Sequence, residues 1–363
     1  MQKGNILIQL IEIKRKLYQN NQMDNKKSFS IEYTTFIKGI AIVLLVIHHY
    51  SGIQYCSNVD LFNTNIREII FNLCKVCVSV FAILSGYGMY KSAIKQTNII
   101  KLSLKRILLV LIGYWMAFIV WLIYTLIYMG SIDVVYKKSI VVSFIKDCFG
   151  LCHIGYPTNS LNGVSWFIGA ILIFYICFPL LFWTIKKLKN FDWILVLLSA
   201  ISLILYAFGI ELYLYDSIVY YAFAFVLGMF IAKRQLFDFF VNYKLNSPKV
   251  ILMAMVFVLS CIIRLVVGLV FDTLFAVIVI IVLITIFQKN KIIDKVSIFF
   301  GKEELFIYLF HTTVLSFVGI YFGWMNKWIS RLVAFAGTII IAFVFTKVYK
   351  NIKNRLSERV FSG

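Results

Sequence analysis

The stretch that decides the fold is "FIKGIAIVLLVIHHYSG", residues 36–52, an apolar run with Lys38 near its start and His48 and His49 near its end. A transmembrane helix needs about 20 predominantly apolar residues, and runs of this kind recur along the chain. Ionisable side chains are costly in hydrocarbon, so those inside membrane helices tend to face the bundle interior and to serve a function. We therefore expect this first helix to anchor the chain in a membrane and to contribute to a functional site.

The composition is that of a membrane protein. Of the 363 residues, 61% are hydrophobic and 14% are charged, whereas soluble domains carry about 25% charged residues. The net charge of +20 does not indicate a nucleic-acid-binding domain, because Lys and Arg flank the apolar segments instead of forming a basic block. Cation-rich and cation-poor connections alternate, as the positive-inside rule requires.

We predict an all-α, polytopic membrane bundle of about ten transmembrane helices, with both termini cytoplasmic because the number of spans is even. The division is a basic cytoplasmic leader at 1–32, a membrane domain at 33–350 and a basic cytoplasmic tail at 351–363. The predicted spans are 36–53, 68–90, 106–128, 164–183, 191–209, 213–232, 250–270, 271–288, 303–322 and 329–348.

Two features outside the first span also carry expectations. The longest connection, 129–163, has several turn-forming glycines, which suit an ordered loop on the outer face, although its role is not indicated. Arg264 lies deep in a predicted span, and Asp272, two turns further on, is its expected partner.

Helical geometry places Lys38 and His49 on one face. Eleven steps of about 100° return almost to the starting direction, with a separation of about 16 Å along the axis, whereas His48 points some 80° away, toward a neighbouring helix. A cation at the membrane edge with a base deeper on the same face suits a long anionic substrate whose reactive end lies innermost. The alternative is that these residues have no role in a site. Lys38 would then extend its ammonium group to the membrane–water interface, and His48 and His49 would be packed with satisfied hydrogen bonds.

A second polar face comes late in the chain. Glu304, Tyr308 and His311 are spaced four and three residues apart, so they share one side of a helix. We interpret Glu304 as a solvated interfacial acid, and we expect His311 to orient substrate or to shuttle a proton.

Five motifs, taken in order, resemble the membrane acyltransferase-3 family over residues 33 to 320. Lys38 and Gly39 precede His49 at the spacing of that family's first-helix motif. The quoted segments are "IKGIAIVLLVIHH" (37–49), "VFAILSGYGMYKS" (80–92), "SLKRILLVLIGYW" (103–115), "VSWFIGAILIFYICFPLL" (164–181) and "FFGKEELFIYLFHTTVL" (299–315). Departures from the family pattern are Thr35 in place of an acid, Ser103 in place of the first cation at the third span, and Glu304 in place of a serine.

The resemblance implies an integral protein of the bacterial cell membrane that transfers an acyl group, usually acetyl from acetyl-CoA, to a hydroxyl of an envelope glycan or glycolipid. His49 would be the base, Lys38 would hold a coenzyme A phosphate or order the site, and no metal is expected. The sequence does not reveal the acceptor hydroxyl or the acyl chain, whether a ternary complex or an acyl-enzyme relay operates, or whether the protein forms a homodimer.

The resemblance also implies binding residues. Lys105, Arg106 and Tyr308, with Lys38, would contact the coenzyme, although ordinary membrane anchoring is the alternative for Arg106 and is favoured for Lys101. The expected acceptor-binding residues are Ser85, Tyr87, Trp166 and His48. For Ser85 the alternative is close helix packing together with Gly86. For Trp166 it is an aromatic belt at the membrane interface.

A transporter or flippase of a polar lipid-linked sugar is the competing hypothesis. It would use the same buried polar residues to line a path across the membrane. Transporters usually show internal repeats and helices broken by Gly or Pro, and this chain shows no internal repeat and has only three prolines.

Overall fold

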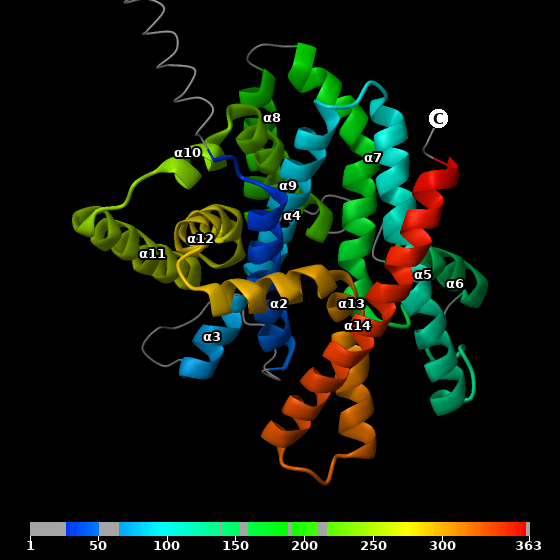
Figure 1. The fold of residues 1–363 in the computed structure, drawn as a ribbon. Coiled ribbons are helices and arrows are strands. Elements are labelled where there is room, and N and C mark those ends of the chain that lie inside the picture. Colours follow the sequence, from blue (N-terminus) through cyan, green and yellow to red (C-terminus); the bar gives the residue numbers. More distant parts are fainter. Residues whose placement is uncertain are drawn as a thin grey trace, which may run out of the picture.

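The computed structural model describes residues 27–50, 65–137, 139–152, 159–187, 191–208 and 216–360, and the regular structure of these residues is entirely helical. Figure 1 shows the helices assembled into a bundle. The predicted all-α class is therefore confirmed. Most of the predicted leader, the end of the first predicted span, the junction of the fifth and sixth, and the last three residues of the tail lie outside the described residues.

The helices follow one another along the chain with short connections between most of them. They are α2 (Ile31–Tyr50), α3 (Ile66–Cys74), α4 (Cys77–Ala93), α5 (Ile99–Met129), α6 (Ile140–Cys148), the 3-10 turn η1 (Gly163–Ser165), α7 (Trp166–Lys187), α8 (Phe191–Ala207), α9 (Asp216–Arg234), α10 (Leu236–Asn242), α11 (Ser247–Val267), η2 (Gly268–Phe271), α12 (Asp272–Ile286), α13 (Lys291–Tyr321) and α14 (Lys327–Val360).

Seven helical stretches of the described chain are long and apolar enough to cross a membrane, so the protein is a multi-pass membrane protein. They are Ile31–Tyr50, Ile66–Ala93, Ile99–Met129, Gly163–Lys187, Ser247–Ile286, Lys291–Tyr321 and Lys327–Leu356. The stretch Ser247–Ile286 contains both α11 and α12, which the sequence divides into two spans, and Asp192–Leu205 is a shorter apolar helix. The count of ten spans therefore stays a prediction.

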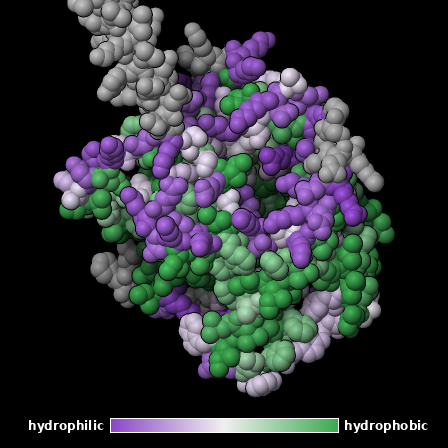
Figure 2. Space-filling model, viewed as in Figure 1, coloured by the Kyte–Doolittle hydropathy of each residue, from purple (hydrophilic) through white to green (hydrophobic). Residues whose placement is uncertain are grey.

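The two described ends of the chain lie at the same end of the bundle, where α2 begins and α14 finishes (Figure 1). Figure 2 shows hydrophilic residues gathered over this end and a broad apolar surface below it. This distribution suits a basic membrane face at the end that carries both termini. That this face is the cytoplasmic one stays a prediction.

The packing that positions the site is the contact between α2 and α13. A Cβ atom added at Gly39 would overlap the carbonyl oxygen of Ser297, and one added at Gly301 would overlap the carbonyl oxygen of Thr35. The backbones of the two helices therefore touch, as small residues allow in membrane bundles. The first turns of α13 lie across α2, and its later turns run alongside α2 (Figure 1).

The predicted partnership of Arg264 and Asp272 is confirmed. Arg264 Nε donates to Asp272 Oδ1 at 2.5 Å, and both side chains are buried. Ser79 Oγ donates to the other carboxylate oxygen at 3.1 Å, and an Arg264 Nη2 donor reaches the carbonyl of Asn72 at 3.3 Å. The group joins α3, α4, α11 and α12, and it satisfies charges that would otherwise be costly in the membrane interior.

The described part of the 129–163 connection is ordered around a buried carboxylate. Tyr136 Oη and the backbone N–H of Leu161 each donate to Asp147 Oδ2 at 2.7 Å, and Tyr114 Oη donates to Oδ1 at 3.0 Å. Burial raises the pKa of Asp147, although its hydrogen bonds act in the opposite direction. These bonds hold α6 against α5 and against the chain that leads into α7.

We predict that Gly301→Ala destabilises the protein, because the added methyl group meets backbone atoms that cannot move aside. Overpacking of this kind costs about 1–3 kcal/mol or more, so the unfolding temperature in detergent, measured by intrinsic fluorescence, should fall by several degrees. Gly319→Ala, in the same helix but with open space at the added atom, is the matched control and should be neutral or slightly stabilising. Equal unfolding temperatures for the two variants would contradict the close contact of α2 and α13.

Candidate active site

A small cavity of about 140 Å³ lies where α2, α4, α5, α7 and α13 meet, and its polar lining includes Lys38, Ser85, Glu304 and Tyr308. Lys38 Nζ is 2.5 Å from Glu304 Oε1, and both side chains are half-buried. The interpretation of Glu304 as a solvated interfacial acid is therefore wrong. The carboxylate pairs with the lysine because the later turns of α13 lie beside α2, a proximity that the spacing along one helix does not reveal.

Tyr308 connects this cavity to a pair of histidines further along α2 and α13. Its hydroxyl donates a hydrogen bond to the carbonyl of Val164, which fixes the ring against the start of α7. The ring centroid of Tyr308 lies 6.2 Å from that of His311, and the His311 centroid lies 4.8 Å from that of His49. The structure thus brings together His49 and His311, which are 262 positions apart in the chain.

The hydrogen bonds of His311 define its tautomer. Nδ1 lies 2.7 Å from the carbonyl oxygen of Tyr308 and 3.1 Å from that of Ile307. Carbonyl oxygens only accept, so Nδ1 carries the proton, and in the neutral ring Nε2 carries a lone pair. Nε2 is buried and has no hydrogen-bond partner among the described residues. A buried polar atom without a partner requires an explanation, and a bound water or ion, or a catalytic role, is among the usual ones.

The two histidines of α2 have different surroundings. His48 stacks on Phe71, with a centroid separation of 4.1 Å, and its Nδ1 lies 2.9 Å from the Phe71 carbonyl oxygen, so it faces α3 as the helical geometry predicts. His49 faces α13, as Lys38 does, but the residue is exposed at the end of α2 and does not line the cavity beside Lys38. The cavity therefore ends at Tyr308, one turn before His311.

A cationic hollow of about 570 Å³ lies next to this cavity. Lys101, Lys105, Arg106 and Lys353 line it, and Lys353 is within electrostatic range of Lys38 as well as of Lys105 and Arg106. The successive α5 residues Leu109 and Val110 line the hollow and the inner cavity respectively, so the two spaces are adjacent. Lys353 was missed because it lies in the basic end of α14, where the sequence indicates only a tail.

Two of the expected acceptor-binding residues lie elsewhere. Tyr87 packs between Phe29 and Phe237, at centroid separations of 5.1 and 5.5 Å, and Trp166 packs on Tyr221 at 5.6 Å. Neither lines the Lys38 cavity, whereas Ser85 does. The role that each was predicted to have in acceptor binding stays a prediction.

A polar cluster that the sequence did not suggest supports α13 beside His311. Asn162 Nδ2 donates to the carbonyl of Leu309 at 3.3 Å and to Thr313 Oγ1 at 3.1 Å, and Thr312 Oγ1 donates to Asn162 Oδ1 at 3.0 Å. An asparagine just before a glycine reads as a turn residue in the sequence. Its contact with α13 follows only from the tertiary fold.

The fold and the site together define a multi-pass helical membrane protein with a buried histidine one turn beyond a cavity that Lys38 lines. The family model described as an acyltransferase domain, that of the acyltransferase-3 family, matches residues 31–347. The chain belongs to this family and is a membrane acyltransferase. No significant match was found among curated proteins or among solved structures.

The charge-swapped double variant Lys38→Glu/Glu304→Lys distinguishes a role of the ion pair in stability from a role of Lys38 in substrate binding. A half-buried pair contributes about 1 kcal/mol, so each single reversal should lower the unfolding temperature and the swap should recover most of the loss. If Lys38 also binds an anionic substrate, the swap will fold normally and still lose acyl transfer. Full recovery of acyl transfer together with stability would assign the pair a structural role alone.

Proposed function

We propose that this protein is an integral O-acyltransferase of the bacterial cytoplasmic membrane. It transfers an acetyl group from acetyl-CoA to a hydroxyl of a cell-surface polysaccharide or of its lipid-linked precursor. The observation that carries the proposal is the fixed tautomer of His311, whose Nε2 has no partner among the described residues and whose ring centroid lies 4.8 Å from that of His49. Membership of the acyltransferase-3 family supports this function over the transporter.

The cationic hollow suits the donor. Coenzyme A carries three phosphate groups, and Lys101, Lys105, Arg106 and Lys353 offer charge-assisted hydrogen bonds to phosphate oxygens. The adjacent cavity, with Lys38 and Tyr308 in its wall, lies between this hollow and the histidines. The pantetheine arm would pass through it and carry the thioester toward His311 and His49.

The chemistry needs one base and no redox step. His49 takes the proton of the acceptor hydroxyl as the oxygen attacks the thioester carbonyl. The tetrahedral intermediate expels the coenzyme A thiolate, which receives the proton from the His49 imidazolium, and an ester and free coenzyme A remain. His311 holds its proton on Nδ1 and leaves Nε2 without a partner among the described residues, and its ring centroid lies 4.8 Å from that of His49. In the proposed reaction the His49 ring would turn so that its N–H donates to this Nε2, which would orient the other His49 nitrogen toward the hydroxyl.

We predict that His49→Ala lowers acyl transfer by at least about a hundredfold, which is typical for the loss of a general base. The purified full-length protein is incubated with radiolabelled acetyl-CoA and a membrane glycan fraction, and ester-linked label is counted. His311→Ala should give a smaller loss, because it removes the orientation of His49 and not the base.

The unfolding temperature of each histidine variant controls for misfolding. A folded His49→Ala protein with wild-type turnover would remove His49 from the mechanism. Movement of a lipid-linked sugar across the membrane of proteoliposomes, without any acylation, would favour the transporter hypothesis.

We predict that Lys105→Gln, Arg106→Gln and Lys353→Gln each raise KM for acetyl-CoA about threefold to tenfold, because each removes one charge-assisted contact with phosphate. The value of kcat should change little, since these residues lie away from the thioester. Lys186→Gln, at an exposed basic position at the end of α7, is the matched control. An unchanged KM in the triple variant would place the coenzyme elsewhere.

A further inference from the structure

A third space, larger than the Lys38 cavity, lies at the opposite end of α2 from Lys38. It is an apolar groove of about 680 Å³ between α3 and α14, with the outer half of α2 as its floor. Its walls include Val43, Ile47, Ile70, Leu332 and Phe335, several of which are exposed, so the groove opens sideways toward the surrounding lipid. The mechanism described above does not use this groove.

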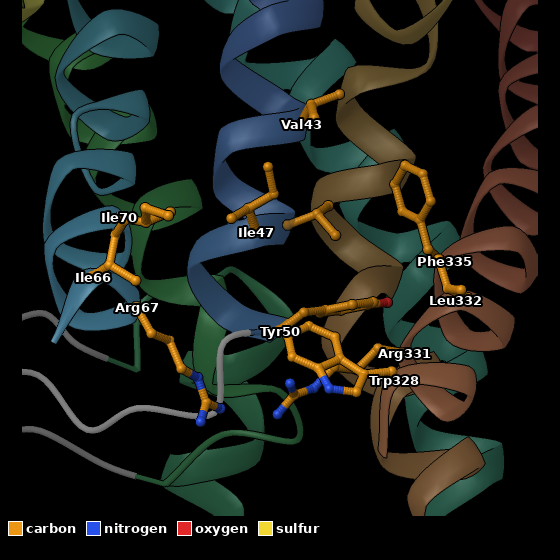
Figure 3. Close-up of a pocket in the computed structure, with 11 residues that line it drawn as sticks. Val43, Ile47, Tyr50, Ile66, Arg67, Ile70, Trp328, Arg331, Leu332 and Phe335 are labelled. Atoms are coloured by element: carbon orange, nitrogen blue, oxygen red, sulfur yellow. The ribbon is translucent and has the colours of Figure 1, made fainter. Parts of the chain in front are cut away.

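One end of the groove is charged. Figure 3 shows the guanidinium groups of Arg67 and Arg331 at the same end as Trp328 and Tyr50, whereas Val43 and Phe335 lie toward the other end. The Arg331 guanidinium lies over the Trp328 ring at 5.3 Å. The groove is therefore apolar along its length and has cations and aromatic rings at its mouth. This arrangement suits an amphiphile with an anionic head group.

The mouth of the groove is joined to the histidine pair. Tyr50, whose side chain lines the groove, donates a hydrogen bond from its hydroxyl to the carbonyl oxygen of His311 at 3.1 Å. It also lies 3.2 Å from Thr338 Oγ1 of α14. Tyr50 follows His49 directly in α2 and contacts His311, so this residue links the groove to the histidine pair.

We propose that this groove binds the lipid carrier of the acceptor glycan, with its polyprenyl chain against α2, α3 and α14 and its phosphate at Arg67 and Arg331. The inference rests on the proposed function, because only a lipid that presents a sugar hydroxyl gains from being held beside His49. The two like charges favour a phosphate over a neutral head group. A bulk anionic phospholipid is the competing occupant, and the experiment distinguishes the two.

The test measures lipid retention and not acyl transfer. Purified full-length protein in detergent is exposed to a polyprenyl monophosphate, to the matching polyprenol without phosphate, and to phosphatidylglycerol, and retained lipid is counted by native mass spectrometry. The wild type should retain the polyprenyl monophosphate in preference to both others. Arg67→Gln/Arg331→Gln should lower its retention about tenfold or more, as the loss of charge-assisted contacts predicts.

Two controls keep the result decisive. Arg67→Lys/Arg331→Lys keeps both charges and should retain most of the binding, and Lys327→Gln removes an exposed neighbouring cation that does not line the groove and should bind as the wild type does. Unchanged retention in the double Gln variant, equal retention of the polyprenol, or equal retention of phosphatidylglycerol would each overturn the proposal. Selective retention by a protein that shows no acyl transfer would leave the groove assigned and refute the proposed function instead.

Discussion

The direct backbone contact between α2 and α13 is the constraint on which the site depends. Because Gly39 and Gly301 carry no side chains, the two helices approach until a Cβ atom on either would meet a carbonyl oxygen of the other. At that separation Lys38 reaches Glu304, and His49 reaches His311 further along the same pair of helices. Larger residues at the crossing would move both pairs apart together. The packing of these two helices therefore sets both the Lys38–Glu304 distance and the His49–His311 distance.

The membrane interior makes unpartnered polar atoms informative. Arg264 and Asp272 satisfy one another there, and Asn162 satisfies Thr312 and Thr313. His311 differs from these two groups, since one ring nitrogen is tied to backbone carbonyls and the other is buried without a hydrogen bond among the described residues. An apolar residue would fill the same space at lower cost, and the ring lies against His49, so His311 is better explained by reaction than by packing.

Helical periodicity predicts which residues of one helix share a face, whereas contacts between residues of different helices follow only from the tertiary fold. The eleven-residue spacing of Lys38 and His49 predicted a shared face, and both side chains do face α13; the Arg264–Asp272 pair was predicted from the cost of charge in hydrocarbon and is confirmed. Glu304 was misinterpreted because its partner lies on a helix 266 positions away along the chain. Lys353 was missed because its neighbours in the hollow come from α5. A basic segment after a membrane span has the same composition whether it anchors the helix or lines a hollow.

The proposed function requires two kinds of substrate to meet at the histidine pair. In the proposed reaction the charged coenzyme would enter from the cation-lined hollow and a lipid-borne acceptor would enter along the apolar groove, and neither surface suits the other substrate. α2 solves this by contributing to both spaces, with Lys38 in the wall of the inner cavity and Tyr50 in the wall of the groove. Tyr308 at the end of the cavity and Tyr50 at the mouth of the groove both contact His311, one through its ring and one through the His311 carbonyl. His311 therefore lies between the two tyrosines and next to His49. In the proposed reaction the thioester and the acceptor hydroxyl would approach the histidine pair from two different spaces and meet there.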